Sequence, residues 1–245
     1  MNTQSFDDLE RRAPAAREAA LMAALSAQVA HAQASSPAQA ERLKGVDARA
    51  ITSRQALAQL PVLRKGELLQ VQIAAREAGT GDPFAGFSAS GWNGLRYPRP
   101  AKRVFQSPGP LYEPQGHHPD SWRMARGLYA AGMRAGDLVH NSFSYHLTPA
   151  GAMMEEGAFA IGCAVFPGGI GNTELQLAAM ADLRPHGYAG TPSFLKILLE
   201  AAQAKGQALP SLKKAMFSGE AFPPSLRDWF AERGVTGYQC YATAD

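Results

Sequence analysis

The sequence has little of what marks extracellular, membrane-spanning or nucleic-acid-binding proteins. Its 245 residues include only two cysteines, Cys163 and Cys240, so a disulfide framework is not supported and reduced thiols are expected. The net charge of +3, from 24 basic and 21 acidic residues, is too small and too scattered to indicate nucleic acid or anionic membrane as a partner. The longest apolar run, residues 158–166, is far shorter than the roughly 20 residues that a membrane span needs. The N-terminus lacks a secretory signal, which predicts a cytoplasmic protein.

Several motifs with known chemistry are also absent. The chain has no Gly-x-Ser-x-Gly nucleophile turn and no Gly-x-x-x-x-Gly-Lys-Ser/Thr phosphate loop. His117 and His118 are adjacent, but no cysteine or further histidine follows at ligand spacing, so a zinc site is not expected. Any chemistry must therefore come from side chains that the fold brings together.

What the chain does contain is 46% hydrophobic and 18% charged residues, which is typical of a globular protein. We divide it into a helical N-terminal segment (residues 1–80), a Gly/Pro-rich loop (81–103) and an α/β part (104–245). Helices are predicted over residues 15–34, with Leu21, Leu25 and Val29 on one face, and over residues 64–75. Thr52 and Gln55 have the spacing of a capping box.

Short apolar runs alternate with longer amphipathic segments from residue 104 onward. Strands are predicted at 104–105, 138–141, 163–166 and in three later runs, and helices at 121–131, 148–161, 173–183, 193–205 and 224–232. Thr173 and Gln176 have the spacing of a second capping box. The alternation predicts an α/β fold with a mostly parallel sheet and flanking helices.

Small, hydroxyl-bearing and acidic residues follow the last three of these apolar runs. They are residues 190–193 (Gly-Thr-Pro-Ser), residues 218–220 (Ser-Gly-Glu) and residues 241–245 (Tyr-Ala-Thr-Ala-Asp). Ligands of parallel α/β sheets bind at the carboxyl ends of the strands, so these ends form a plausible site wall. The alternative is ordinary loop chemistry, because the same residue types dominate turns.

Most of the titratable side chains of the α/β part are expected to be structural or solvated. Among the acids, only Glu220 and Asp245 fall at strand ends, where they could hold a nucleotide or Mg²⁺. The other acids are predicted to lie in helices or caps and to be solvated: Asp120, Asp137, Glu155, Glu156 and Glu174. His140 is predicted to be structural, and His146, at a strand-to-helix junction, is the best histidine candidate for a site.

The segment after the first strand, residues 106–116, is interpreted as a loop that could bind phosphate through backbone N–H groups, with Ser107 and Gly109 near its start. Pro108, Pro110 and Pro114 have no N–H, which weakens that interpretation.

Taken together, these segments resemble the phenylacetate–CoA ligase family of adenylate-forming enzymes, over the whole chain and matched to the N-terminal half of such a ligase. The segments that carry the resemblance are residues 60–68 (Leu-Pro-Val-Leu-Arg-Lys-Gly-Glu-Leu), 143–151 (Phe-Ser-Tyr-His-Leu-Thr-Pro-Ala-Gly), 167–169, 190–193, 218–221 and 241–245. Each of these motifs is weak alone, but together they occur in the family's order and spacing.

The resemblance implies specific roles. Ser218, Gly219, Glu220 and Ala221 would bind the nucleotide, with Tyr241 stacked on adenine and Thr243 at the phosphate. Asp245 would bind Mg²⁺, and Phe143, Tyr145, His146 and Gly219 would line the acyl pocket. The implied ligands are ATP or AMP, magnesium, CoA and a carboxylic acid, without nucleic acid or membrane, and a homodimer is one option for the assembly.

The sequence also departs from the family pattern. Ser107-Pro108-Gly109-Pro110 replaces a loop rich in Ser, Thr and Gly; Ala244 replaces a phosphate-contacting hydroxyl, and Asp245 replaces a glutamate. We expect the family's ribose-binding aspartate and catalytic lysine to lie beyond Asp245, so this chain would be a truncated, by itself inactive, part of a ligase. The alternatives are a non-catalytic nucleotide- or acyl-binding protein that kept the fold, and an acyl transfer without ATP.

Overall fold

The computed structural model describes residues 5–91 and 101–242. They form two compact units, which we call the helical unit (residues 7–117) and the sheet unit (residues 118–242 with residues 5 and 6). The sequence-based boundary lies between residues 103 and 104, whereas the contacts group residues 103–115 with the helical unit.

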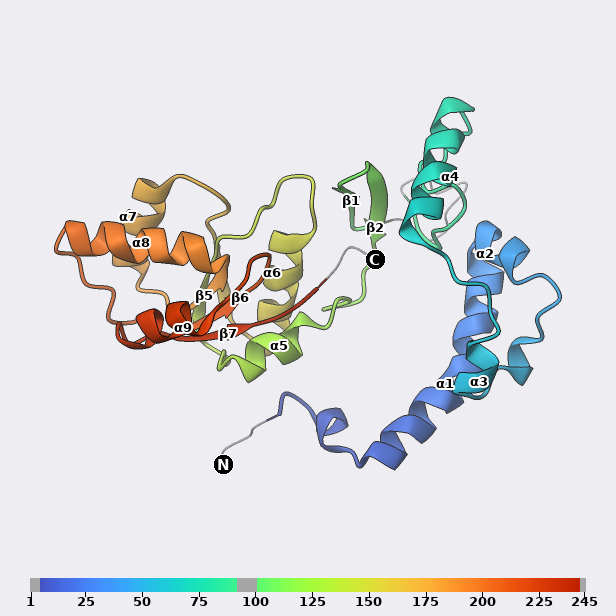
Figure 1. Ribbon diagram of the computed structural model, residues 1–245, viewed down its shortest axis with the longest axis horizontal. Coiled ribbons are helices and arrows are strands. Elements are labelled where there is room, and N and C mark those ends of the chain that lie inside the picture. The colour runs from blue at the N-terminus through green and yellow to red at the C-terminus, as the bar shows by residue number, and fades with distance from the viewer. Residues whose placement is uncertain (1–4, 92–100, 243–245) are drawn as a thin grey trace. The chain divides into compact units, whose positions relative to one another are not determined.

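The helical unit begins with η1 (Asp8–Arg11) and the long helix α1 (Pro14–Ser35), followed by α2 (Pro37–Arg42), η2 (Ala48–Ala50), α3 (Arg54–Leu57) and α4 (Lys65–Glu77) (Figure 1). Val29 of α1 is buried in a small core with Leu43, Ala48 and Ile51, and Leu25 packs against this core. Leu21, at the other end of the predicted stripe, is 50% exposed.

The helix predicted from the first capping box exists, but its cap differs. The side chain of Ser53, not Thr52, accepts a hydrogen bond from the Ala56 N–H, so Ser53 is the N-cap of α3. A cap residue needs extended backbone and a short side chain pointing back at the first turn, and Ser53 meets both conditions.

Residues 106–116 are not a loop, as the sequence-based interpretation had it. Strands β1 (Arg103–Ser107) and β2 (Leu111–Gln115) form an antiparallel hairpin around Pro108, Gly109 and Pro110. The buried amide of Gln72 in α4 fixes the hairpin: it accepts from the Tyr112 N–H at 2.9 Å and donates to the Tyr112 carbonyl at 3.1 Å. This long-range contact has no signal in the local sequence.

The sheet unit contains the predicted parallel sheet. Its strands are β3 (Leu138–Asn141), β4 (Ala164–Pro167), β5 (Gly187–Gly190), β6 (Lys214–Phe217) and β7 (Thr236–Gln239), in the order β4-β3-β5-β6-β7 and all parallel. The helices are α5 (Met124–Ala130), α6 (Ala150–Ile161), α7 (Thr173–Leu183), α8 (Pro192–Ala204) and α9 (Pro224–Ala231). The mixed α/β fold with a parallel sheet is therefore confirmed.

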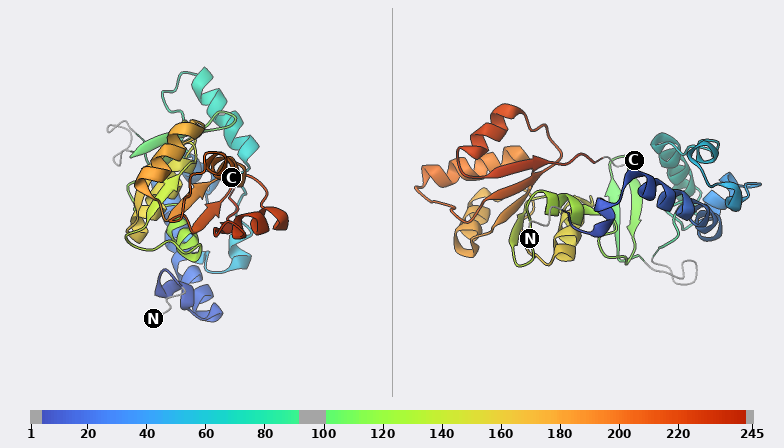
Figure 2. Two further views of the ribbon diagram at one scale, coloured as in Figure 1. Left: turned by 90° about the vertical axis from the view of Figure 1, so that its left-hand side faces the viewer. Right: turned by 90° about the horizontal axis from the view of Figure 1, so that it is seen from below.

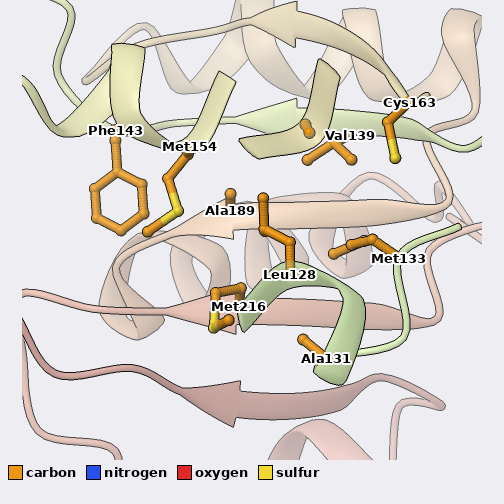
Figure 3. Close-up of a cluster of buried hydrophobic side chains, with 10 residues drawn as sticks. Leu128, Ala131, Met133, Val139, Phe143, Met154, Cys163, Ala189 and Met216 are labelled. Carbon is orange, nitrogen blue, oxygen red and sulfur yellow. The ribbon is translucent and has the colours of Figure 1, made fainter. Parts of the chain in front are cut away.

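Helices cover both faces of this sheet (Figures 1 and 2). Successive strand residues alternate between two cores: Ala189 and Met216 face α5 and α6, while Tyr188 and Phe217 face α7, α8 and α9. Figure 3 shows the first of these cores, in which Leu128 and Met154 approach the strands. A parallel sheet buried on both faces needs such apolar residues in succession, as the short apolar runs predicted.

Two sequence-based expectations about polar residues of the sheet unit were wrong. Asp137 is not solvated: its carboxylate pairs with Lys214 at 2.6 Å and accepts from the Arg134 N–H at 2.6 Å. Glu156, on the core side of α6, is 8% exposed. Glu156 lies on the inward face of α6, and Asp137 precedes β3 and pairs with Lys214 of β6; the local sequence shows neither arrangement.

The prediction that Thr173 and Gln176 form a capping box was also wrong. The residue before α7 is Asn172, without a side-chain cap, and Gln176 is buried. The Gln176 amide donates to the carbonyl oxygens of Gly169 at 2.8 Å and Gly171 at 2.7 Å, and its oxygen accepts from the Ser142 hydroxyl at 2.8 Å. Gln176 therefore ties the loops after β3 and β4 together.

His140, on β3, completes this buried polar cluster. Its Nε2 lies 2.7 Å from Oε1 of Gln176, and an amide oxygen only accepts, so Nε2 carries the proton. Burial lowers the pKa of His140 below its ordinary value, and the hydrogen bond to Gln176 offsets only part of that effect. His140 is thus neutral and structural, as the sequence predicted.

The contact between α5 and α6 gives a first prediction. A Cβ added at Gly157 would lie 2.7 Å from Cβ of Met124 and 2.8 Å from the Ala125 nitrogen. We expect Gly157→Ala to destabilise the protein by about 1–3 kcal/mol, because backbone cannot yield as a side chain can. The control is Gly66→Ala in α4, where no atom lies within 4 Å and alanine should be neutral or stabilising. Urea unfolding measures both, and equal stability changes would contradict the prediction.

The buried histidine gives a second prediction. Unfolded His140 binds a proton near its ordinary pKa of about 6.5, whereas folded His140 binds one only at lower pH. Its contribution to stability is therefore complete above about pH 6.5 and is lost as the pH falls below that value, by at most about 1.4 kcal/mol per pH unit. We expect the free energy of unfolding, measured with urea, to change less between about pH 7.5 and pH 5.5 in His140→Asn than in the wild type. The exposed His118→Asn is the control, and an unchanged difference in His140→Asn would refute this account.

Candidate functional site

The carboxyl ends of β5, β6 and β7 lie side by side, because these strands are neighbours and run in the same direction. Backbone hydrogen bonds continue past the strands: Ser218 N–H donates to Gly190, and Cys240 N–H donates to Phe217. The three segments singled out from the sequence thus begin at one edge of the sheet, as expected for parallel strands.

Glu220 is the best-anchored acid at this edge. Its carboxylate accepts from the Ser193 hydroxyl at 2.8 Å and from the Ser193 N–H at 3.3 Å, and its carbonyl accepts from the Gln239 amide at 2.8 Å. Ser193 lies in the first turn of α8, where the positive end of the helix dipole favours a carboxylate. Residues at the ends of the two neighbouring strands, β5 and β7, therefore hold Glu220 in place while leaving it exposed.

The residues around Glu220 leave open space. Gly219 has φ of +82°, which favours glycine, and a Cβ there would meet only Cγ2 of Thr191, at 3.8 Å. Ala221 is exposed, Ser218 is half-buried, and the Tyr241 side chain is 90% exposed. An exposed tyrosine ring at the same edge of the sheet as an open glycine turn suits a planar ring stacked on the tyrosine. Thr243 and Asp245 lie outside the described residues.

Position 190, at the end of β5, has to be glycine because the Tyr188 side chain lies against it. A Cβ there would collide with the hydroxyl of Tyr188, which donates to the Thr191 carbonyl at 3.3 Å. Burial raises the pKa of Tyr188 well above its ordinary range, so its hydroxyl stays protonated and keeps this bond. The bond fixes the chain where it enters α8.

Of the four residues predicted to line an acyl pocket, Gly219 is described above, and Phe143, Tyr145 and His146 lie in different surroundings. Phe143 is 8% exposed and packs in the core with Met154 (Figure 3). Tyr145 is half-buried, with its hydroxyl 2.8 Å from the Asn141 amide and 3.0 Å from the Glu155 carboxylate, so Glu155 is not simply solvated either. His146 is exposed, and its N–H donates to the Ser144 hydroxyl.

The residues assigned to a phosphate loop belong to the hairpin of the helical unit. The Ser107 hydroxyl donates to the Glu113 carboxylate at 2.6 Å, and Ser107 is 3% exposed. At Gly109, a Cβ would lie 3.0 Å from Leu69 of α4. Both residues are thus engaged within their own unit.

Sequence reasoning missed Gln239 and Asn141. Gln239 holds the carbonyl of Glu220, and the Asn141 amide donates to Gly151 at 2.8 Å as well as contacting Tyr145. Both are amide side chains that end a strand, next to segments already singled out, and that position was the available signal.

Within residues 5–91 and 101–242, no group of three or more His, Cys, Asp or Glu side chains is arranged to hold a metal ion. None of the helices in that part of the chain is both long and apolar enough to cross a membrane.

Comparison with known proteins relates the chain to one group of enzymes by sequence. It is 31% identical over 131 residues to the phenylacetate-coenzyme A ligase of Aromatoleum evansii, which covers 51% of this chain and 30% of that protein. It is 35% identical over 125 residues to the enzyme of the same name from Thermus thermophilus, which covers 50% of this chain and 28% of that protein. The match thus spans less than a third of each relative. No protein-family model matches the chain.

Solved structures show the fold. An open conformation of 2-hydroxyisobutyryl-CoA ligase in complex with 2-HIB-AMP and CoA has a TM-score of 0.79 at 24% identity, over 94% of this chain and 51% of that one. The same ligase in the postadenylation state with R3-HIB-AMP has a TM-score of 0.83 at 22% identity, over 99% of this chain and 52% of that one. This chain spans about half the length of these structures. It is thus related by sequence to the phenylacetate–CoA ligases and has the fold of the adenylate-forming CoA ligases.

Proposed function

We propose that this chain is the nucleotide- and acyl-binding part of an acid–CoA ligase. The observation that carries the proposal is the edge formed by the ends of β5, β6 and β7, where Glu220 is anchored next to the open Gly219 turn and where the exposed Tyr241 follows β7. The sequence relation to phenylacetate–CoA ligases supports it, as does the likeness to a ligase bound to 2-HIB-AMP and CoA.

The reaction of such a ligase has two steps. A carboxylate oxygen of the acid attacks the α-phosphorus of ATP, the bond from that phosphorus to the oxygen bridging to the β-phosphorus breaks, and pyrophosphate leaves. The thiol of CoA then loses its proton and attacks the acyl carbon, and AMP leaves. Catalysis rests on positioning and on neutralising the phosphate charge, and the protein need not form a covalent bond.

The proposed roles of the chain's own residues follow from where they lie. Tyr241 would stack on the adenine ring, while Gly219, Glu220 and Ala221 would line its edge. Tyr145, held by Asn141 and Glu155, would present its ring to the acid. Asp245, by resemblance, would bring Mg²⁺ to the phosphates, where the cation would offset negative charge.

A second candidate is a nucleotide-binding protein without ligase activity. One observation favours it: the hydroxyl of Ser107 is buried and donates to Glu113, while the neighbouring Pro108 and Pro110 lack N–H groups. A hairpin with so few free donors would bind the β- and γ-phosphates weakly. The two candidates share the adenine site and differ in how they treat the triphosphate.

The adenine site is tested with matched tyrosine variants. We expect Tyr241→Ala to weaken AMP binding about tenfold, because stacking of a base on an aromatic ring contributes roughly 1–3 kcal/mol. The control is Tyr238→Ala, which removes another exposed ring, within β7 rather than beyond its end. It should leave the affinity for AMP unchanged within about twofold. Isothermal titration calorimetry with AMP measures both. If the two variants weaken binding equally, the assignment of Tyr241 fails.

The prediction that residues 106–116 bind phosphate can be tested. A charge-assisted hydrogen bond is worth roughly 1.5–3 kcal/mol, so a hairpin lacking two or three of them gains little from the extra phosphates. We expect Mg·ATP to bind no more than about tenfold tighter than AMP, and we expect no pyrophosphate release from this chain with Mg·ATP and phenylacetate. Calorimetry and a coupled pyrophosphate assay measure these quantities. Submicromolar Mg·ATP binding, or release of pyrophosphate, would contradict the expectation that this hairpin contributes little to phosphate binding.

A further inference from the structure

A cavity of about 800 Å³ lies within the helical unit. The last turn of α4, the turn after it and the two strands of the hairpin enclose it. The side chains that matter here are those of Ala75, Arg76, Asp82, Pro83, Val104 and Tyr112. The volume falls in the range of small-molecule sites, which is about 300–1,000 Å³.

The walls of this cavity are held in place. Gln72, one helical turn before Arg76, fixes the backbone of Tyr112 through two hydrogen bonds, and the Gln106 amide donates to the Tyr112 hydroxyl at 3.1 Å. The carboxylate of Asp82 accepts from the N–H groups of Phe84 at 3.1 Å and Gly86 at 2.8 Å. The carboxylate is thereby turned toward the backbone of its own loop, and the cavity is formed before any ligand arrives.

Arg76 is the polar group without a complete set of partners. Its Nη1 is buried and has no hydrogen-bond partner. Its Nη2 lies 3.5 Å from the Pro110 carbonyl, and its guanidinium carbon lies 5.4 Å from the centre of the Tyr112 ring. A buried N–H without an acceptor is costly, and a guanidinium keeps its charge at any physiological pH. Arg76 lines the cavity, so an anionic oxygen there would pair with the charge of its guanidinium.

The rest of the lining is mostly apolar. Carbon surface is offered by Ala75, Pro83, Val104 and the ring of Tyr112. Val104 is 39% exposed, although it is an apolar residue of a strand. A single cationic group beside an apolar surface matches a molecule with one anionic end and an apolar body. A polyphosphate or a sugar would leave most of its polar groups without partners.

We propose that this cavity binds a small monocarboxylate with an apolar ring or chain. The carboxylate would accept from the guanidinium of Arg76, and the apolar body would lie against Val104 and the Tyr112 ring. The site lies wholly within the helical unit, so it is separate from the strand-end edge of the sheet unit and does not depend on the function proposed for that edge.

The test uses a charged probe and its uncharged isostere, 2-naphthylacetate and 2-naphthylacetamide. Calorimetry on the wild-type chain should give an affinity for the acid at least about tenfold higher than for the amide. Arg76→Gln should remove that difference, lowering the affinity for the acid without changing that for the amide. Arg49→Gln removes a charge from the same unit at a residue outside the cavity and should leave the difference intact.

The position of the probe is read from the methyl signals of Val104 in ¹³C-valine-labelled protein, identified by their loss in Val104→Trp. These signals should shift on addition of the acid, and Val104→Trp, which fills the cavity, should abolish binding there even if Arg76→Gln does not fold. Equal affinities for acid and amide, acid binding without a shift at Val104, or no binding of the acid at millimolar concentration would each overturn the proposal.

Discussion

The sheet unit depends on one constraint, which is that both faces of a five-stranded parallel sheet must be buried. The strands meet it by alternation: Tyr188 and Phe217 point to one core, and Ala189 and Met216 point to the other. Each short strand therefore has to be followed by a helix that returns across a face. That connection brings every carboxyl end to the same edge, and the edge is where Glu220 and Tyr241 lie.

Strand ends that converge still need to be fixed in position, and buried amides do this in both units. Gln176 ties the loops after β3 and β4 to Ser142 and His140. Gln72 ties the hairpin to α4 through the backbone of Tyr112. An amide has donors and an acceptor on one rigid group, so it can satisfy several backbone groups without adding a charge to the interior.

Much of the organisation could be read from the sequence. The strands at 138–141 and 187–190 and the helices after them follow from apolar run length and from Gly and Pro at their ends. What could not be read is the inward face of each helix. Gln176 has the spacing of a cap yet is buried, Asp137 pairs with Lys214, and Ser53 rather than Thr52 caps α3. For Gln176 and Asp137 the partners that decide the outcome, Ser142 and Lys214, are far away in the chain.

The candidate site divides in the same way. By itself the sequence determined the fold class, the order of the strand-end segments and the presence of Gly219, Glu220 and Tyr241 at one edge, because alternation and chain direction are local properties. Only the tertiary structure decided that Ser193 and Gln239 hold Glu220, that Phe143 belongs to the core, and that Ser107 donates to Glu113 across a hairpin. Those outcomes depend on pairings between residues separated along the chain, and such pairings are set by packing rather than by local propensity.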